Sequence, residues 1–134
     1  MRIFFDVDQT LICTQGTLRP GVAELFGRLK QEGHTLYVWS GNGIRWDVVD
    51  RYSLRAFVED CFFKPLYNFK EAIVRARLPV APDLCIDDAP EVVEAFGGIV
   101  VTPYGQPNPA DREMGWVYQQ LKRYGSSSRP VLSG

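Results

Sequence analysis

The sequence predicts a single α/β domain in which a five-stranded, mainly parallel sheet is covered by helices on both faces. The chain has 134 residues, enough for one domain with a substantial buried core. With 46% hydrophobic and 23% charged residues, its composition is that of a compact globular protein. Short hydrophobic segments alternate along the chain with segments of helical periodicity, the pattern of parallel strands joined by helical crossovers.

The predicted strands are short runs of hydrophobic, β-branched or aromatic residues, and polar or turn-forming residues bound them. Nearly continuous hydrophobic runs such as RIFFDV are typical of parallel strands that are buried on both faces. The strands are expected at residues 2–7, 35–39, 58–63, 83–86 and 98–101.

Helical periodicity identifies the first two helices. Hydrophobic residues recur within 22–29 at positions i, i+3, i+4 and i+7, Pro20 suits the first turn, and Gly33 supplies a left-handed stop. A second helix is expected in 44–52, after the turn SGNG that follows the second strand.

Capping signals predict the later helices. Asn68 is expected to cap the third helix, with Glu71 three residues on, and Pro90 opens a short fourth helix. Asn108, followed by proline, is expected to cap the last helix. These elements complete a Rossmann-like, three-layer domain at residues 1–124, and 125–134 are predicted to form a flexible C-terminal tail.

Charge and hydropathy exclude several classes of protein. Fifteen basic and sixteen acidic residues give a formal net charge of -1, which indicates no general attraction to nucleic acid or to an anionic membrane. No hydrophobic run is long enough to span a bilayer, and the N-terminus has no signal-peptide pattern. We therefore expect a cytoplasmic protein with no membrane partner; no feature of the sequence indicates an oligomeric state.

The cysteines and the single histidine do not form a metal or disulfide pattern. Cys13, Cys61 and Cys85 are odd in number, widely spaced and without a CxxC pair, so we expect reduced thiols. His34 lies far in sequence from the acidic motifs.

Polar side chains follow four of the predicted strands, at the sheet edge where open α/β domains bind ligands. Oxygen ligands in a D-x-D pair, with a second acidic pair from another strand, suit a hard cation, and their oxygen character favours Mg²⁺ over zinc. A hydroxyl and an ammonium group beside such an ion would orient and neutralise a phosphoryl group. The residues in question are Asp6, Asp8, Ser40, Lys64, Asp87 and Asp88.

The D-x-D pair also has the chemistry for phosphoryl transfer. A carboxylate can attack phosphorus to give an aspartyl-phosphate, and a second carboxyl group can protonate the leaving oxygen and later activate water. Asp6 and Asp8 suit these two roles.

At this point the motifs resemble those of the haloacid dehalogenase (HAD) superfamily of phosphotransferases. The segment FFDVDQTL (4–11) resembles the first motif, VWS (38–40) the second, the Lys-Pro pair at 64–65 the third, and LCIDD (84–88) the acidic fourth. Four motifs in the family order, spanning residues 3–101, imply a HAD-like fold and a Mg²⁺-dependent phosphatase, a hydrolase acting through an aspartyl-phosphate.

The resemblance assigns a role to each motif residue. It implies that Asp6 is the nucleophile and a metal ligand, and that Asp8 is the general acid/base and a ligand through its carbonyl. It implies that Ser40 and Lys64 bind the phosphoryl oxygens. The remaining roles are a metal ligand, a supporting carboxylate and a support for the first turn, assigned to Asp88, Asp87 and Thr10 respectively.

Three positions depart from the family pattern or leave an alternative. Gln9 stands where the family most often has glycine, and Glu91 lies near the place of a further fourth-motif aspartate that is missing here. Lys70 competes with Lys64 for the third-motif role, but Lys64 follows a strand directly whereas Lys70 lies inside a predicted helix.

The spacing of the motifs leaves no room for a cap domain. Only a short loop separates Thr10 from Pro20, and nothing is inserted between Phe63 and Asn68. In the family a capless chain implies an open site that admits a bulky or macromolecular phosphorylated substrate. Trp39 and Trp46 flank the second motif, where packing is the commoner role for an aromatic ring than stacking on a ligand.

Two alternative functions remain at this level. Each motif alone is also compatible with turn and capping chemistry, and the fold could serve as a catalytically silent HAD-like binding or regulatory domain. A receiver-type phosphoacceptor domain also combines acids, a hydroxyl and a Lys-Pro pair at strand ends. Its adjacent acid pair comes first and its acceptor aspartate in mid-chain, an order that differs from the one found here.

Overall fold

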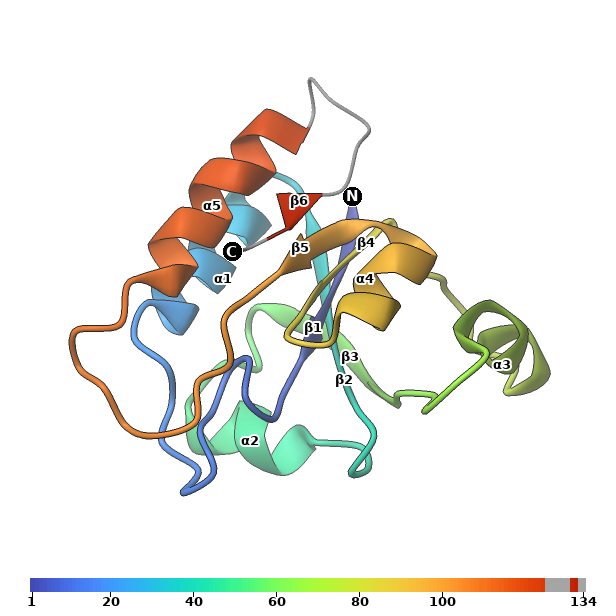
Figure 1. The fold of residues 1–134 in the computed structure, drawn as a ribbon, viewed down its shortest axis with the longest axis horizontal. Coiled ribbons are helices and arrows are strands. Elements are labelled where there is room, and N and C mark those ends of the chain that lie inside the picture. The colour runs from blue at the N-terminus through green and yellow to red at the C-terminus, as the bar shows by residue number, and fades with distance from the viewer. Residues whose placement is uncertain (125–130, 133–134) are drawn as a thin grey trace.

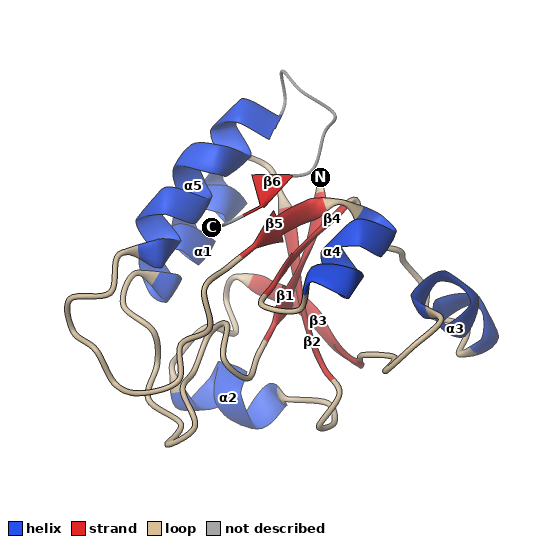
Figure 2. Ribbon diagram, viewed as in Figure 1, coloured by secondary structure: helices blue, strands red, loops and turns tan. Residues whose placement is uncertain are grey.

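A computed structural model describes residues 1–124 and 131–132 of the chain. Its centre is a sheet of six strands in the order β3-β2-β1-β4-β5-β6, and every neighbouring pair is parallel (Figures 1 and 2). The strands are β1 Arg2–Asp6, β2 Thr35–Ser40, β3 Val58–Phe63, β4 Leu84–Asp87, β5 Gly98–Val100 and β6 Val131–Leu132. The helices are α1 Val22–Gln31, α2 Trp46–Arg51, α3 Phe69–Arg75, α4 Pro90–Phe96 and α5 Glu113–Tyr124.

Helices cover both faces of the sheet, as the alternating pattern predicts. The side chains of Ile3 and Phe5 pack toward the face covered by α1, α2 and α5, whereas that of Phe4 packs toward α3 and α4. In Figure 2, α1 and α5 lie together on one side of the sheet and α3 and α4 on the other. Residues 3–7 are therefore buried on both faces, which explains the uninterrupted hydrophobic run in this segment.

The prediction of five strands is wrong by one, because β6 extends the sheet beside β5 with the partners Ile99↔Val131 and Val100↔Leu132. A strand of two residues is too short to carry a periodic signal. The predicted flexible tail covers residues 125–134. Residues 131–132 form β6, and residues 125–130 and 133–134 lie outside the described residues.

Two predicted helix starts also differ from the structure. Asn68 precedes α3 in a left-handed conformation, with φ 50°, and its side chain makes no capping hydrogen bond. The last helix begins at Glu113 rather than directly after Asn108, whose side-chain oxygen instead accepts a hydrogen bond from the backbone N–H of Ala110 at 3.1 Å. Asparagine supports such short turns as readily as it caps helices, so the sequence signal is the same for both.

The strand order places β1 in the middle of the sheet, between β2 and β4. The carboxyl ends of these strands carry Asp6, Ser40 and Asp87, so the residues of three motifs meet at one edge. Receiver-type domains belong to the flavodoxin-like class, whose strand order is 2-1-3-4-5, and the order found here excludes that alternative. Within the described residues, no helix is both long and hydrophobic enough to cross a membrane.

Candidate active site

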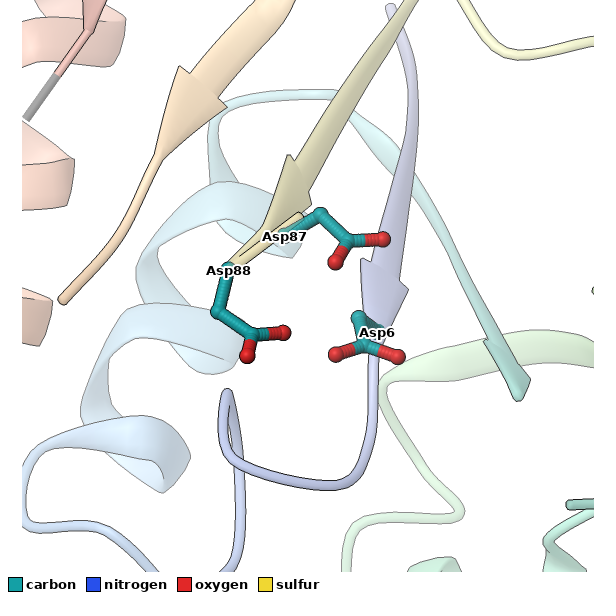
Figure 3. A group of neighbouring side chains, drawn as sticks. All are labelled: Asp6, Asp87 and Asp88. Atoms are coloured by element: carbon teal, nitrogen blue, oxygen red, sulfur yellow. The ribbon is translucent and has the colours of Figure 1, made fainter. Parts of the chain in front are cut away.

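Three carboxylates converge between the ends of β1 and β4. Asp6 ends β1, Asp87 ends β4, and Asp88 follows it directly. Figure 3 shows the three side chains directed toward a common space, and one oxygen atom from each lies within 4.8 Å of the others. Among the residues that the structure describes, this is the one group of three or more side chains with the spacing of metal ligands.

A single lysine contacts two of these carboxylates. The Nζ atom of Lys64 lies 2.7 Å from Oδ1 of Asp6 and 3.0 Å from Oδ2 of Asp87. Its backbone N–H donates to the carbonyl of Ser40 at 2.9 Å, which fixes the start of the β3–α3 connection against the end of β2. Lys70, the competing candidate, is an exposed residue of α3. The structure therefore brings Lys64, and not Lys70, to the carboxylates.

Burial and charge both shift the titration of these groups. Burial raises the pKa of Asp6 to about 8, the charge of Asp87 adds to this rise, and the ammonium of Lys64 opposes it. Burial also raises the pKa of Asp87. Burial lowers the pKa of Lys64, but the two carboxylates outweigh that effect and raise it overall. One ammonium group thus faces three carboxylates, an excess of negative charge that favours a bound cation.

The donor set fits a hard divalent cation. All three groups offer carboxylate oxygens, the ligands that Mg²⁺ prefers, and neither cysteine nor histidine accompanies them. Asp87, expected only to support the site, belongs to the same cluster as Asp6 and Asp88. Glu91 is exposed at the start of α4 and is not part of the cluster.

The turn after β1 fixes the position of Asp6. The hydroxyl of Thr10 donates to Oδ2 of Asp6 at 2.9 Å and reaches Oδ1 of Asp88 at 3.5 Å. Gln9 adopts a left-handed conformation with φ 68°. This is the conformation that glycine adopts most easily, so a glycine at this position would take the same turn without strain.

The carboxylate of Asp8 lies in a separate set of contacts, formed by the segment after β2. It accepts hydrogen bonds from Nδ2 of Asn42 at 2.7 Å, from Nη1 of Arg45 at 3.1 Å and from the hydroxyl of Ser40 at 3.2 Å. Burial raises the pKa of Asp8, but the Asn42 hydrogen bond and the charge and hydrogen bond of Arg45 outweigh it and lower the pKa overall. Arg45 also contacts Asp47, so it bridges two carboxylates.

Sequence reasoning did not identify Asn42 or Arg45 as site residues. Both belong to the segment SGNGIR, in which the glycines were interpreted as a turn. The available signal was their position at the end of a central strand, the same signal that identified Ser40.

A buried arginine contacts the turn that follows β1. Arg19 is only 1% exposed, and its Nε and Nη2 atoms contact the carboxylate of Asp111 at 2.9 and 3.1 Å. Its Nη1 atom donates to the carbonyl of Thr10 at 3.3 Å, and its guanidinium group lies over the ring of Tyr104. The backbone N–H of Tyr104 donates in turn to the carbonyl of Gln9 at 2.7 Å. No local pattern distinguishes such a buried arginine from an exposed one.

The remaining candidates have structural roles. Trp39 is fully buried and packs against the rings of Phe4 and Phe96, so it offers no stacking surface to a ligand. Trp46 is half-buried beneath the guanidinium group of Arg55. His34 lies just before β2, at the opposite end of the sheet from the site. All three cysteines are buried free thiols, as expected.

The two connections that carry cap domains in the resembled family are short here. Residues 7–21 and 64–68, all within the described part of the chain, contain no helix or strand of their own beyond isolated bridges. The carboxylates therefore lie at an edge of the sheet that neither connection covers with an inserted domain.

Comparison with solved structures identifies a protein of the same fold. The crystal structure of D,D-heptose 1,7-bisphosphate phosphatase from Burkholderia thailandensis superimposes with a TM-score of 0.53 at 15% sequence identity. The match covers 90% of this chain and 97% of the other. No family model and no curated protein sequence matches the chain. The shared architecture confirms the expected α/β fold, in which helices cover both faces of a parallel sheet.

Proposed function

We propose that this protein is a Mg²⁺-dependent phosphatase of the HAD type that hydrolyses phosphomonoesters through an aspartyl-phosphate on Asp6. One observation carries the proposal: the residues of all four sequence motifs meet at one edge of the sheet, with Lys64 within 3.0 Å of both Asp6 and Asp87. The fold shared with a sugar-phosphate phosphatase supports the same conclusion.

In the first half of the reaction, the Asp6 carboxylate attacks phosphorus and the bond to the leaving oxygen breaks. Thr10 holds the attacking carboxylate in place by donating to one of its oxygens. Lys64 and Ser40 bind the phosphoryl oxygens, and Asp8 protonates the leaving alcohol. The product of this half is an aspartyl-phosphate and a free alcohol.

In the second half, water attacks the same phosphorus and the acyl-phosphate bond breaks. Asp8, now a carboxylate, removes the proton from the attacking water, and inorganic phosphate leaves. Asp6 is restored as a carboxylate, so the cycle consumes only the ester and water.

Asp6, Asp87 and Asp88 would hold Mg²⁺, together with the Asp8 carbonyl that the family resemblance implies. Bound there, the ion supplies positive charge that neutralises phosphoryl oxygens and the carboxylates around them. The excess of carboxylates over ammonium groups in the structure supports this assignment.

The test is steady-state hydrolysis of 4-nitrophenyl phosphate with Mg²⁺, with EDTA, and by the variant Asp6→Asn. The substitution keeps the shape of the side chain and removes the attacking carboxylate. A matched control is Asp50→Asn, which changes an exposed aspartate of α2. We expect activity that EDTA and Asp6→Asn abolish and that Asp50→Asn leaves intact. Activity that survives in Asp6→Asn would overturn the nucleophile, and an inactive, folded wild type would favour the catalytically silent domain.

A further inference from the structure

Exposed hydrophobic side chains follow two of the strand ends at the edge of the sheet that carries the candidate site. Among the described residues, six large hydrophobic side chains are exposed. Four of them lie near the ends of two neighbouring strands: one follows β2, one is the last residue of β3, and two follow β3. These four are Ile44, Phe63, Leu66 and Tyr67, which are 60%, 53%, 70% and 74% exposed. Hydrophobic side chains that cluster on a surface commonly mark a binding site, whereas single ones do not.

Strand pairing and one close approach place two of these residues beside the second motif. Phe63 is the register partner of Ser40 in the pairing of β2 with β3. Leu66 lies on the turn after Ser40, because a Cβ atom at position 41 would come within 2.8 Å of its Cδ2 atom. Figure 1 shows the segments after β2 and β3 leaving the same end of the sheet.

This position is on the side of the site where the alcohol departs. In the proposed reaction Asp8 protonates the leaving oxygen, and Asp8 is bound by Ser40 and Asn42, the residues on either side of Gly41. The alcohol portion of a substrate therefore emerges beside Leu66. A surface hollow continues from there, lined by Pro65, Leu66, Tyr67, Asn68, Ala72 and Arg75.

Segment 63–67, which ends and follows β3, the neighbour of the second-motif strand, offers few polar groups to a polyhydroxylated alcohol, and the polar side chains of the hollow, Asn68 and Arg75, come from α3 and the residue before it. Sugar hydroxyls require donors and acceptors at fixed positions, and in segment 63–67 the ammonium group of Lys64 is engaged by the carboxylates. Only the Tyr67 hydroxyl remains as a side-chain polar group there. Covering hydrophobic side chains with an apolar group is favourable by about fourfold in affinity for each methylene buried.

We propose that the substrate is a phosphomonoester of an apolar alcohol, and that Phe63, Leu66 and Tyr67 bind its alkyl or aryl group. The inference rests on the proposed phosphatase function and names its substrate class. These three residues determine specificity and take no part in the chemistry.

The test compares two primary alkyl esters of similar ring size, cyclohexylmethyl phosphate and glucose 6-phosphate. Their leaving oxygens are chemically alike, so a difference in kcat/KM reports recognition of the ring. The variants are Leu66→Ser and Tyr67→Ser, and the matched control is Val74→Ser, which changes the 76% exposed valine of α3. All three positions are exposed, so we expect each variant to fold.

We expect the wild type to prefer cyclohexylmethyl phosphate by at least about tenfold in kcat/KM. Leu66→Ser and Tyr67→Ser should each reduce this preference about fivefold, mainly through KM, and Val74→Ser should retain it. A wild type that prefers glucose 6-phosphate, or a preference unchanged in both variants, overturns the inference. The same preparations are assayed with 4-nitrophenyl phosphate. If 4-nitrophenyl phosphate is hydrolysed but cyclohexylmethyl phosphate is not preferred, only the proposed specificity is overturned. If no ester is hydrolysed, the proposed phosphatase function is overturned as well.

Discussion

Oδ1 of Asp6 lies 2.7 Å from Nζ of Lys64, so the proposed nucleophile is in direct contact with the lysine proposed to bind the phosphoryl group. The same ammonium group contacts Asp87, while Asp88 completes the carboxylate cluster. In the absence of a cation, a single positive charge must offset these acids inside a largely buried site. The metal-free protein therefore stores unfavourable electrostatic energy at the candidate site.

The excess of carboxylates over ammonium groups predicts that the metal-free protein loses stability as the pH rises from 5 to 8. Burial and the charge of Asp87 raise the pKa of Asp6 from 3.8 to about 8, so the folded protein keeps a proton that the unfolded chain releases. The stabilisation from that proton is complete below pH 3.8 and is lost as the pH rises through the folded pKa. The measurement is the free energy of unfolding in urea with EDTA at pH 5 and pH 8.

In Asp6→Asn the same loss should be smaller, because the amide does not titrate. A free energy of unfolding that rises across this range, or an equal loss in the variant, would contradict the assignment.

Magnesium should stabilise the folded protein at pH 8 through the carboxylate cluster. At a Mg²⁺ concentration a hundred times its Kd, the free energy of unfolding should rise by about 2.7 kcal/mol, since binding to the folded state alone has this effect. Asp88→Asn should remove most of the gain. Asp83→Asn is the control, because Asp83 precedes β4 and its carboxylate binds the backbone N–H of Arg2 at the other end of the sheet. An equal gain in the two variants would place the ion elsewhere.

Removing Arg45 should shift the pH dependence of the reaction. Burial alone would raise the pKa of Asp8, and the Asn42 hydrogen bond together with Arg45 lowers it. In Arg45→Gln the pKa of Asp8 should therefore rise, and the limb of the kcat profile that reports Asp8 should move to higher pH. The control is Arg55→Gln, which also removes a positive charge but at a residue after α2 that pairs with Asp50 on the surface. Profiles that coincide in the two variants would show that Arg45 does not tune Asp8.

The buried pair of Arg19 and Asp111 should be essential for stability. Arg19→Met leaves the carboxylate of Asp111 without its partner and frees the carbonyl of Thr10, which should lower the free energy of unfolding by about 3–5 kcal/mol. The double variant Arg19→Met, Asp111→Leu should recover much of the loss, because no buried charge is left unpaired. Urea denaturation of both variants measures this; a single variant as stable as the wild type would contradict it.

Much of the site could be predicted from the sequence because a parallel sheet brings the carboxyl ends of its strands together. Asp6, Ser40 and Asp87 end strands that the hydrophobic pattern locates to within one residue, so the strand-end rule was sufficient to group them. The same rule placed Lys64 with them, because Lys64 directly follows β3 and that strand has the predicted bounds.

The residues that sequence reasoning missed owe their roles to contacts between distant segments. Arg19 and Asp111 are 92 positions apart, and nothing in either local pattern indicates that they meet. The hydrogen bonds from Asn42 and Arg45 to Asp8 depend on how the turn after β2 folds against the turn after β1. Strand β6 is set by pairing with β5 and not by any periodicity of its own.

The central position of β1 has a consequence for folding during synthesis. Of the described elements, this strand leaves the ribosome first, yet its two neighbours in the sheet are β2 and β4, and β4 ends at Asp87. One edge of β1 therefore stays unpaired until about two thirds of the chain has emerged. A nascent chain arrested before residue 84 should expose a hydrophobic strand with free hydrogen-bonding groups, the kind of segment that chaperones bind.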